Sequence, residues 1–143
     1  MKMIFAFLFV LILLTSIFLF TLPNMNMEKT QIKRNNKTIL KGVEVAKNPL
    51  DLTKGLMFRE KTDGMLLVFP TEGKHGIWML FMKIPLDLVF IDKNNKIVDI
   101  IKNVQPMSLN LSTWKTYYPK ENAKYCLEVN PGTELKIGDV LEF

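Results

Sequence analysis

The sequence is poor in the residue types that build metal centres and covalent cross-links. Its 143 residues include one cysteine and one histidine, so no disulfide can close within the chain and a zinc site made of cysteine and histidine is excluded. The nine methionines are best explained as adaptable core residues rather than as ligands for a soft metal. The seven glycines form no phosphate-binding loop. We therefore expect no metal and no cofactor.

The charge pattern needed for binding a nucleic acid is also missing from most of the chain. The formal net charge is +5, but residues 1–37 hold five basic side chains and one acidic one, whereas residues 38–143 hold 14 basic and 13 acidic ones. A nucleic-acid surface needs clustered lysine and arginine to displace counterions from phosphates. The nearly neutral second part of the chain therefore predicts no nucleic-acid partner.

The first feature that is present is a long apolar run from Met3 to Leu22 without a charged residue. A helix of this length spans about 30 Å, enough to cross the hydrocarbon core of a bilayer. A cleaved secretory signal would have a shorter apolar region and small residues at its end, so residues 1–22 are predicted to be a transmembrane anchor, with a signal segment as the alternative. Residues 23–37 are polar and are predicted to be a tether.

The side of the membrane is indicated less directly. Lysines and an arginine follow the apolar run, and the positive-inside rule read literally would keep the domain in the cytoplasm. The two-residue head, with Lys2 as its only charged side chain, resembles the start of a secretory segment instead. We expect residues 38–143 to form an extracytoplasmic domain that is held at the membrane.

From residue 38 onward, short β-type runs alternate with turn-forming clusters. Strands are predicted over 39–46, 65–69, 77–82, 86–91, 96–101, 123–129 and 139–143, with a short helix or helical turn within 48–60. Two of these runs are joined through Asn94 and Asn95, which tolerate the positive φ angles of a tight hairpin. Many short strands with few helical stretches predict a mainly β domain, a sandwich or a barrel.

Six blocks in this part resemble, in order and spacing, the family called domain of unknown function 192. They are GLMFR (55–59), DGMLLVFP (63–70), IWM (77–79), IPLDLVFID (84–92), YYP (117–119) and KYCLEVNPG (124–132). The resemblance covers residues 40–143 and implies a small mainly β domain, a sandwich or jelly-roll-like barrel with one short helix, but no activity. Many members carry a polar Lys-Asn-Thr triplet where this chain has Leu80, Phe81 and Met82, which favours apolar packing or an apolar ligand there.

Two residues could take part in catalysis. His75 lies in a loop and could be a general base, because its ordinary pKa near 6.5 allows proton transfer near neutrality. Asp87 opens an apolar strand, where an ionised carboxylate needs partners. Asp87 could form a hydrolytic site with His75, but we favour a structural role, either as a cap on the turn before the strand or in an ion pair with Arg59 or Lys83. An envelope-directed hydrolase that uses His75 and Asp87 is therefore the alternative function.

The leading hypothesis is a domain that binds a small ligand, a glycan or a partner protein without catalysis. Aromatic residues outside the regular strands suit recognition, because a ring gives a large contact area with a polar handle. The predicted ligand-binding residues are Trp78, Asp87, Arg59, Trp114, Tyr117 and Tyr118. A purely structural or assembly module is a further possibility, in which the loop at 110–120 only covers one end of the domain.

Overall fold

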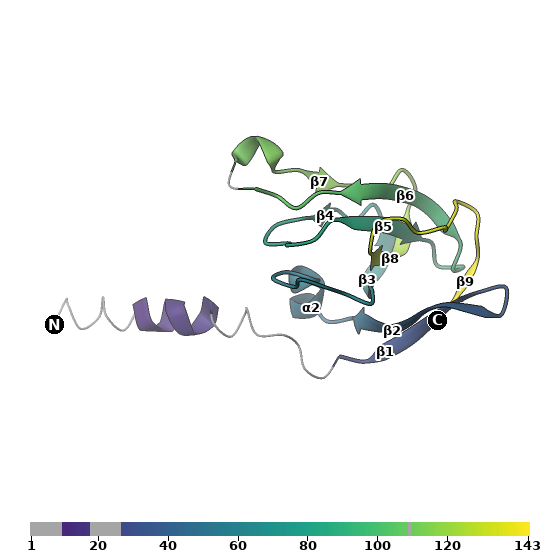
Figure 1. Cartoon of the computed structure of the whole chain (residues 1–143), viewed down its shortest axis with the longest axis horizontal. Helices are drawn as coiled ribbons and strands as arrows, with labels where there is room; N and C mark the ends of the chain where they lie inside the picture. The colour runs from purple at the N-terminus through teal and green to yellow at the C-terminus, as the bar shows by residue number, and fades with distance from the viewer. Residues whose placement is uncertain (1–9, 18–26, 109) are drawn as a thin grey trace.

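The computed structural model describes residues 10–17, 27–108 and 110–143 (Figure 1). Residues 10–17 are helical. Among the described residues, no helix is both long enough and apolar enough to cross a bilayer. Most of the predicted anchor, residues 3–22, lies outside the described ranges, so the anchor stays a prediction.

Apart from the helical residues 10–17, the described residues form nine strands and one short α-helix, which confirms the mainly β class. The strands are β1 (Lys29–Arg34), β2 (Lys37–Ala46), β3 (Met65–Gly73), β4 (Ile77–Trp78), β5 (Leu86–Ile91), β6 (Ile97–Val104), β7 (Thr116–Tyr117), β8 (Ala123–Val129) and β9 (Leu141–Glu142). The helix α2 (Pro49–Lys54) begins where predicted, because Asn48 accepts a hydrogen bond from the amide of Asp51 and Pro49 occupies the first turn. A 3₁₀ turn, η1 (Leu111–Thr113), precedes β7.

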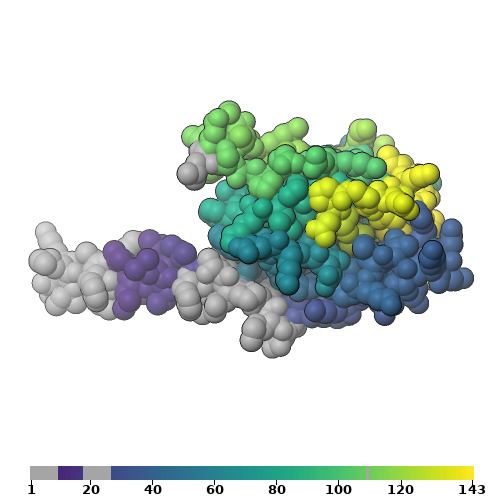
Figure 2. Space-filling model, viewed as in Figure 1, coloured from purple at the N-terminus to yellow at the C-terminus, as the bar shows by residue number. Residues whose placement is uncertain are grey.

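Seven strands form one sheet in the order β6-β5-β8-β3-β2-β1-β9, and β4 and β7 form a separate two-stranded sheet. All neighbours are antiparallel except β2 and β3. The predicted barrel is wrong, because the large sheet does not close: its two edges meet only at an isolated bridge between Lys96 and Val140 and at neighbouring backbone hydrogen bonds. The C-terminal segment, yellow in Figure 2, covers this gap between β1–β2 and the strands around β5.

Both faces of the large sheet are buried. On one face, which we call the helix face, Leu67, Leu88 and Cys126 belong to a cluster that also contains Leu56 and Met79 from the covering segments. On the opposite face, a second cluster gathers apolar residues of β1, β2, β3, β5, β6, β8 and the C-terminal segment. All six residues of β5 are buried, which explains why its sequence is almost continuously apolar.

The hairpin predicted through Asn94 and Asn95 is confirmed by the antiparallel pairing of β5 with β6. Asn95 adopts a positive φ of 63°. Asp92 fixes the turn, since its Oδ1 accepts hydrogen bonds from the amides of Asn94 and Lys96. The turn therefore forms for the reason that the sequence suggests.

Two predicted boundaries are wrong. Residues 29–34, assigned to the tether, form β1, in which Ile32 is fully buried; a single apolar residue among five polar ones gave no visible alternation. The strand predicted over 77–82 ends at Trp78, because the amide of Met82 turns back to the carbonyl of Met79 and Phe81 takes a positive φ of 57°. An unbroken apolar run cannot reveal a turn of this kind by its periodicity.

Candidate functional site

The small sheet of β4 and β7 turns one side toward the core and the other toward solvent. Ile77 lies opposite Tyr117 and Trp78 lies opposite Thr116. Ile77 is buried and Tyr117 packs against the helix-face cluster. Because neighbouring residues of a strand point to opposite sides, Trp78 and Thr116 point outward, and Trp78 is 44% exposed.

Two further rings extend this outer side. Trp114 and Tyr118 lie two residues before and after Thr116 and are 53% and 60% exposed. The indole nitrogen of Trp114 donates a hydrogen bond to the carbonyl of Ser108 at 3.1 Å. The ring of Tyr118 covers Gly76, where a Cβ atom would lie 2.8 Å from the ring Cε1 atom. We call the three exposed rings of Trp78, Trp114 and Tyr118 the aromatic surface.

Tyr117, the fourth aromatic residue predicted to bind a ligand, does not belong to this surface. It is half-buried on the inner side of β7, and the ammonium group of Lys115 lies 4.9 Å from the centre of its ring. Its role in the structure is packing with a cation–π contact.

Asp87 is a structural residue of the opposite face rather than part of an ion pair. It is 1% exposed. Its two oxygens accept hydrogen bonds from the amide of Asn103 at 2.7 Å and from the amides of Gly132 and Thr133 at 3.1 and 3.2 Å. The predicted ion pair is wrong, because Arg59 binds Glu44 and Lys83 binds Glu60. Asp87 has a structural role, but it does not cap the turn before β5 as predicted, since it joins the bulge of β6 to the turn after β8.

His75 lies far from Asp87. Its Nε2 atom is 2.7 Å from the carbonyl of Thr71 and its ring stacks on Phe69 with centroids 4.3 Å apart. Asp87 pairs with Val129 at one end of β8, whereas Gly73, which the His75 ring touches, pairs with Ala123 at the other end. At about 3.3 Å per residue, these ends are roughly 20 Å apart. The hydrolytic pair of His75 and Asp87 is therefore not assembled.

Arg59 lines a small charged cleft. Its Nη2 atom lies 2.7 Å from Oε2 of Glu44, and both side chains are mostly buried. The cleft has a volume of about 230 Å³ and is lined by Lys29, Gly42, Glu44, Arg59, Lys61, Thr62, Asp63 and Gly64. With Glu44 already bound to Arg59, the arrangement is that of a structural ion pair at the floor of a polar cleft.

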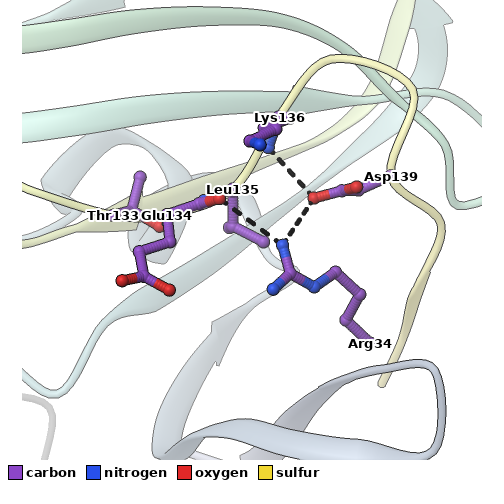
Figure 3. A network of polar contacts seen from close by, with 6 residues as sticks. All are labelled: Arg34, Thr133, Glu134, Leu135, Lys136 and Asp139. Carbon is purple, nitrogen blue, oxygen red and sulfur yellow. Dashed lines mark hydrogen bonds and ion pairs between the residues drawn. The ribbon is translucent and has the colours of Figure 1, made fainter.

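A second charged contact, which we did not predict, lies at the C-terminal segment (Figure 3). Nη1 of Arg34 lies 2.8 Å from Oδ2 of Asp139, and the same Asp139 oxygen accepts a hydrogen bond from the amide of Lys136 at 3.0 Å. These two hydrogen bonds hold the pKa of Asp139 below its ordinary value. The contact fastens β1 to the segment that spans the open edges of the sheet, beside a cleft of about 530 Å³.

Glu128 was not predicted as a site residue from the sequence, although its surroundings shift its pKa strongly. It is 5% exposed on the helix face, and its Oε2 atom has no hydrogen-bond partner. Burial raises its pKa to about 7. Burial, together with the nearby charge of Glu128, raises the pKa of the Cys126 thiol. The sequence did hold an indication of this carboxyl group, because alternation along β8 places Glu128 on the same side as the apolar-packed Cys126.

Two solved structures share this fold. One protein of Novosphingobium aromaticivorans, of unknown function, superposes with a TM-score of 0.74 at 22% identity, covering 85% of this chain and 90% of that one. A protein of Sinorhizobium meliloti, provisionally described as a transcription regulator, superposes with a TM-score of 0.73 at 30% identity, covering 84% and 97%.

Sequence relatives point to the same group. A UPF0127 protein of Pyrococcus furiosus is 32% identical over 110 residues, which is 71% of this chain and 85% of the relative. A UPF0127 protein of Pyrococcus abyssi is 28% identical with the same coverage. The profile of the DUF192 family, described as an uncharacterized ACR, matches residues 29–143. The chain therefore belongs to the DUF192 family, as its six sequence blocks predicted.

Proposed function

We propose that this protein is a membrane-anchored binding domain that presents the aromatic surface to a ligand outside the cytoplasm. The anchor rests on the uncharged run from Met3 to Leu22. Since β1 begins at Lys29, only residues 23–28 separate the run from the folded domain. Fully extended, they reach roughly 20–25 Å, so the domain would lie close to the membrane.

The observation that carries the binding proposal is the exposure of three aromatic rings on one side of β4–β7. Trp78, Trp114 and Tyr118 are each 44% exposed or more. The hydrogen bond from Trp114 to Ser108 and the cover that Tyr118 gives to Gly76 fix two of the three rings before any ligand arrives. Rigid rings lose little conformational entropy on binding, and they suit a glycan, whose apolar ring faces can stack while hydroxyl groups bond the polar tips.

Intrinsic fluorescence tests this proposal directly, because both tryptophans of the chain belong to the aromatic surface. The full-length protein is titrated with a panel of soluble oligosaccharides, and with peptides for comparison. We expect a glycan to shift the tryptophan emission in a saturable way. Trp114→Ala should weaken that binding about tenfold, which corresponds to about 1.4 kcal/mol.

Phe143→Ala is the matched control, because Phe143 is a partly exposed ring at the C-terminus that contacts Tyr125 rather than the aromatic surface. This variant should bind like the wild type. A panel that leaves the emission unchanged, or a Trp114→Ala variant with wild-type affinity, would overturn the glycan proposal. A response to peptides alone would identify the surface as a protein interface instead.

A further inference from the structure

Glu128 lies in the middle of a row of residues that crosses the sheet. Glu44 pairs with Met65, Met65 with Glu128, and Glu128 with Leu88, so these four side chains share the helix face. The strands on either side of Glu128 contribute only apolar residues to this row. A buried carboxyl group without hydrogen-bond donors is stable only when it holds its proton.

The end of α2 covers this carboxyl group. Gly55 follows the helix with a positive φ of 48°, and a Cβ atom there would lie 3.6 Å from Oε2 of Glu128. The charged groups that the covering elements bring to this face are Lys54, which is 6% exposed, and Arg59, which is paired with Glu44. The Oε2 atom of Glu128 therefore faces the backbone of Gly55 and has no hydrogen-bond partner.

The cover consists of two segments, residues 55–60 and 79–84. They are joined at Phe58 and Phe81, where the amide of Phe58 donates a hydrogen bond to the carbonyl of Phe81 at 2.9 Å and the rings stack with centroids 5.2 Å apart. Both phenylalanines have positive φ angles, 64° and 57°. Bulky residues seldom adopt this conformation, which costs about 1–3 kcal/mol each. The closed cover is therefore held against local strain.

We propose that residues 55–60 and 79–84 open as a cover over β8 when Glu128 gives up its proton to water, and that opening makes Cys126 accessible. Cys126 is fully buried in the same cluster as Leu56, Met57, Met79 and Met82, which the cover contributes. Once ionised, the carboxylate requires water or a donor at Oε2, and the closed state supplies neither. Opening provides water and also relieves the strain at Phe58 and Phe81. The device is independent of ligand binding at the aromatic surface.

The expected pH range follows from the two states of Glu128. In the open state its pKa returns toward the ordinary value of 4.5, whereas in the closed state it is about 7. Opening should therefore become more favourable as the pH rises from about 5 to 7 and should level off above 7. A difference of this size corresponds to a change in the opening equilibrium of about two orders of magnitude.

Cys126 is the only cysteine of the chain and reports on the cover directly. The full-length protein is labelled with dithiodipyridine, which also reacts with thiols at acidic pH, and each rate is divided by that of the urea-unfolded protein at the same pH. The wild-type ratio should rise about 40-fold between pH 5 and 7. Glu128→Gln should give a low, flat ratio, and Glu121→Gln, at an exposed position, should behave like the wild type.

Low concentrations of urea separate opening of the cover from global unfolding. The rate of labelling through the cover should depend only weakly on urea, because opening the cover exposes little surface. A labelling rate that depends on urea as steeply as global unfolding does would overturn the proposal. So would identical pH profiles for the wild type and Glu128→Gln. Should Glu128→Gln fail to fold, hydrogen exchange of the wild type decides. After division by the exchange rates of unstructured peptides, residues 55–60 and 79–84 must open together between pH 5 and 7, and an unchanged protection there would overturn the proposal.

Discussion

Asp87 and Glu128 are both almost completely buried on neighbouring strands, yet their surroundings differ completely. Asp87, on the opposite face, receives three backbone hydrogen bonds from the β6 bulge and from the turn after β8. Glu128, on the helix face, has an oxygen without a partner and a pKa of about 7. Burial alone therefore does not determine what an acidic residue does in this domain. The donors supplied by the backbone decide whether it fastens the fold or destabilises it when ionised.

The largest effect is expected from removing the satisfied carboxylate. Asp87→Ala would leave three amides, those of Asn103, Gly132 and Thr133, without their acceptor. Each unsatisfied buried donor costs about 1–3 kcal/mol. Water molecules that enter the site can accept hydrogen bonds from some of these amides and recover part of this cost, so we expect the free energy of unfolding to fall by about 4 kcal/mol. Urea unfolding at constant pH measures this loss.

Asp87→Asn sharpens the comparison because it keeps the shape of the side chain but has only one acceptor oxygen. Its amide group would point toward a backbone N–H, so we expect an intermediate loss of stability. Glu121→Gln, which changes an exposed acid in the same way, should leave stability unchanged. Equal stability of Asp87→Asn and the wild type would mean that charge and hydrogen bonding at this position are dispensable.

Removing the charge of Glu128 should have the opposite sign. The folded protein holds the Glu128 proton up to about pH 7, whereas the unfolded chain loses it near pH 4.5. The folded state therefore has its full stability below about pH 4.5 and loses about 3 kcal/mol by pH 7 and above. Glu128→Gln should remove this loss and be more stable than the wild type at pH 8. A lower stability of the variant at pH 8 would show that the ionised carboxylate finds donors.

Much of the fold was predictable from local pattern. The β5–β6 hairpin carried two runs rich in valine and isoleucine and Asn94-Asn95 at its turn, and Asn48 with Pro49 marked the start of α2. β1 was missed because the KTQIKR segment buries only Ile32 in full. Its pairing with β2 and β9 depends on tertiary contacts, to which a strand's own composition is only a weak guide.

The site was predictable only in part, for a related reason. Trp114 and Tyr118 stood out because they lie outside periodic strands, and both are exposed. Tyr117, between them, turns inward, because β7 pairs with β4 and alternation then fixes its direction. The difference between Asp87 and Glu128 could not be read from the sequence, since the donors of Asp87 lie 16 to 46 residues further along the chain.

The smallest of these effects is expected where a carboxylate is paired but partly exposed. The side chains of Arg34 and Asp139 are 29% and 23% exposed, so solvent screens their attraction, and Arg34→Ala should lower stability by about 1 kcal/mol. Because the pKa of Asp139 is lowered in the folded state, this contribution is present above about pH 4 and disappears as the pH falls further. The difference in the free energy of unfolding between Arg34→Ala and the wild type should therefore be largest at pH 7 and should shrink as the pH is lowered below about 4. The more exposed pair of Lys83 and Glu60 provides the control, since Lys83→Met should change the free energy of unfolding very little. If Arg34→Ala changes it equally little, this ion pair does not hold the C-terminal segment. The segment is then held by its apolar contacts with the sheet, such as those of Leu135 and Leu141.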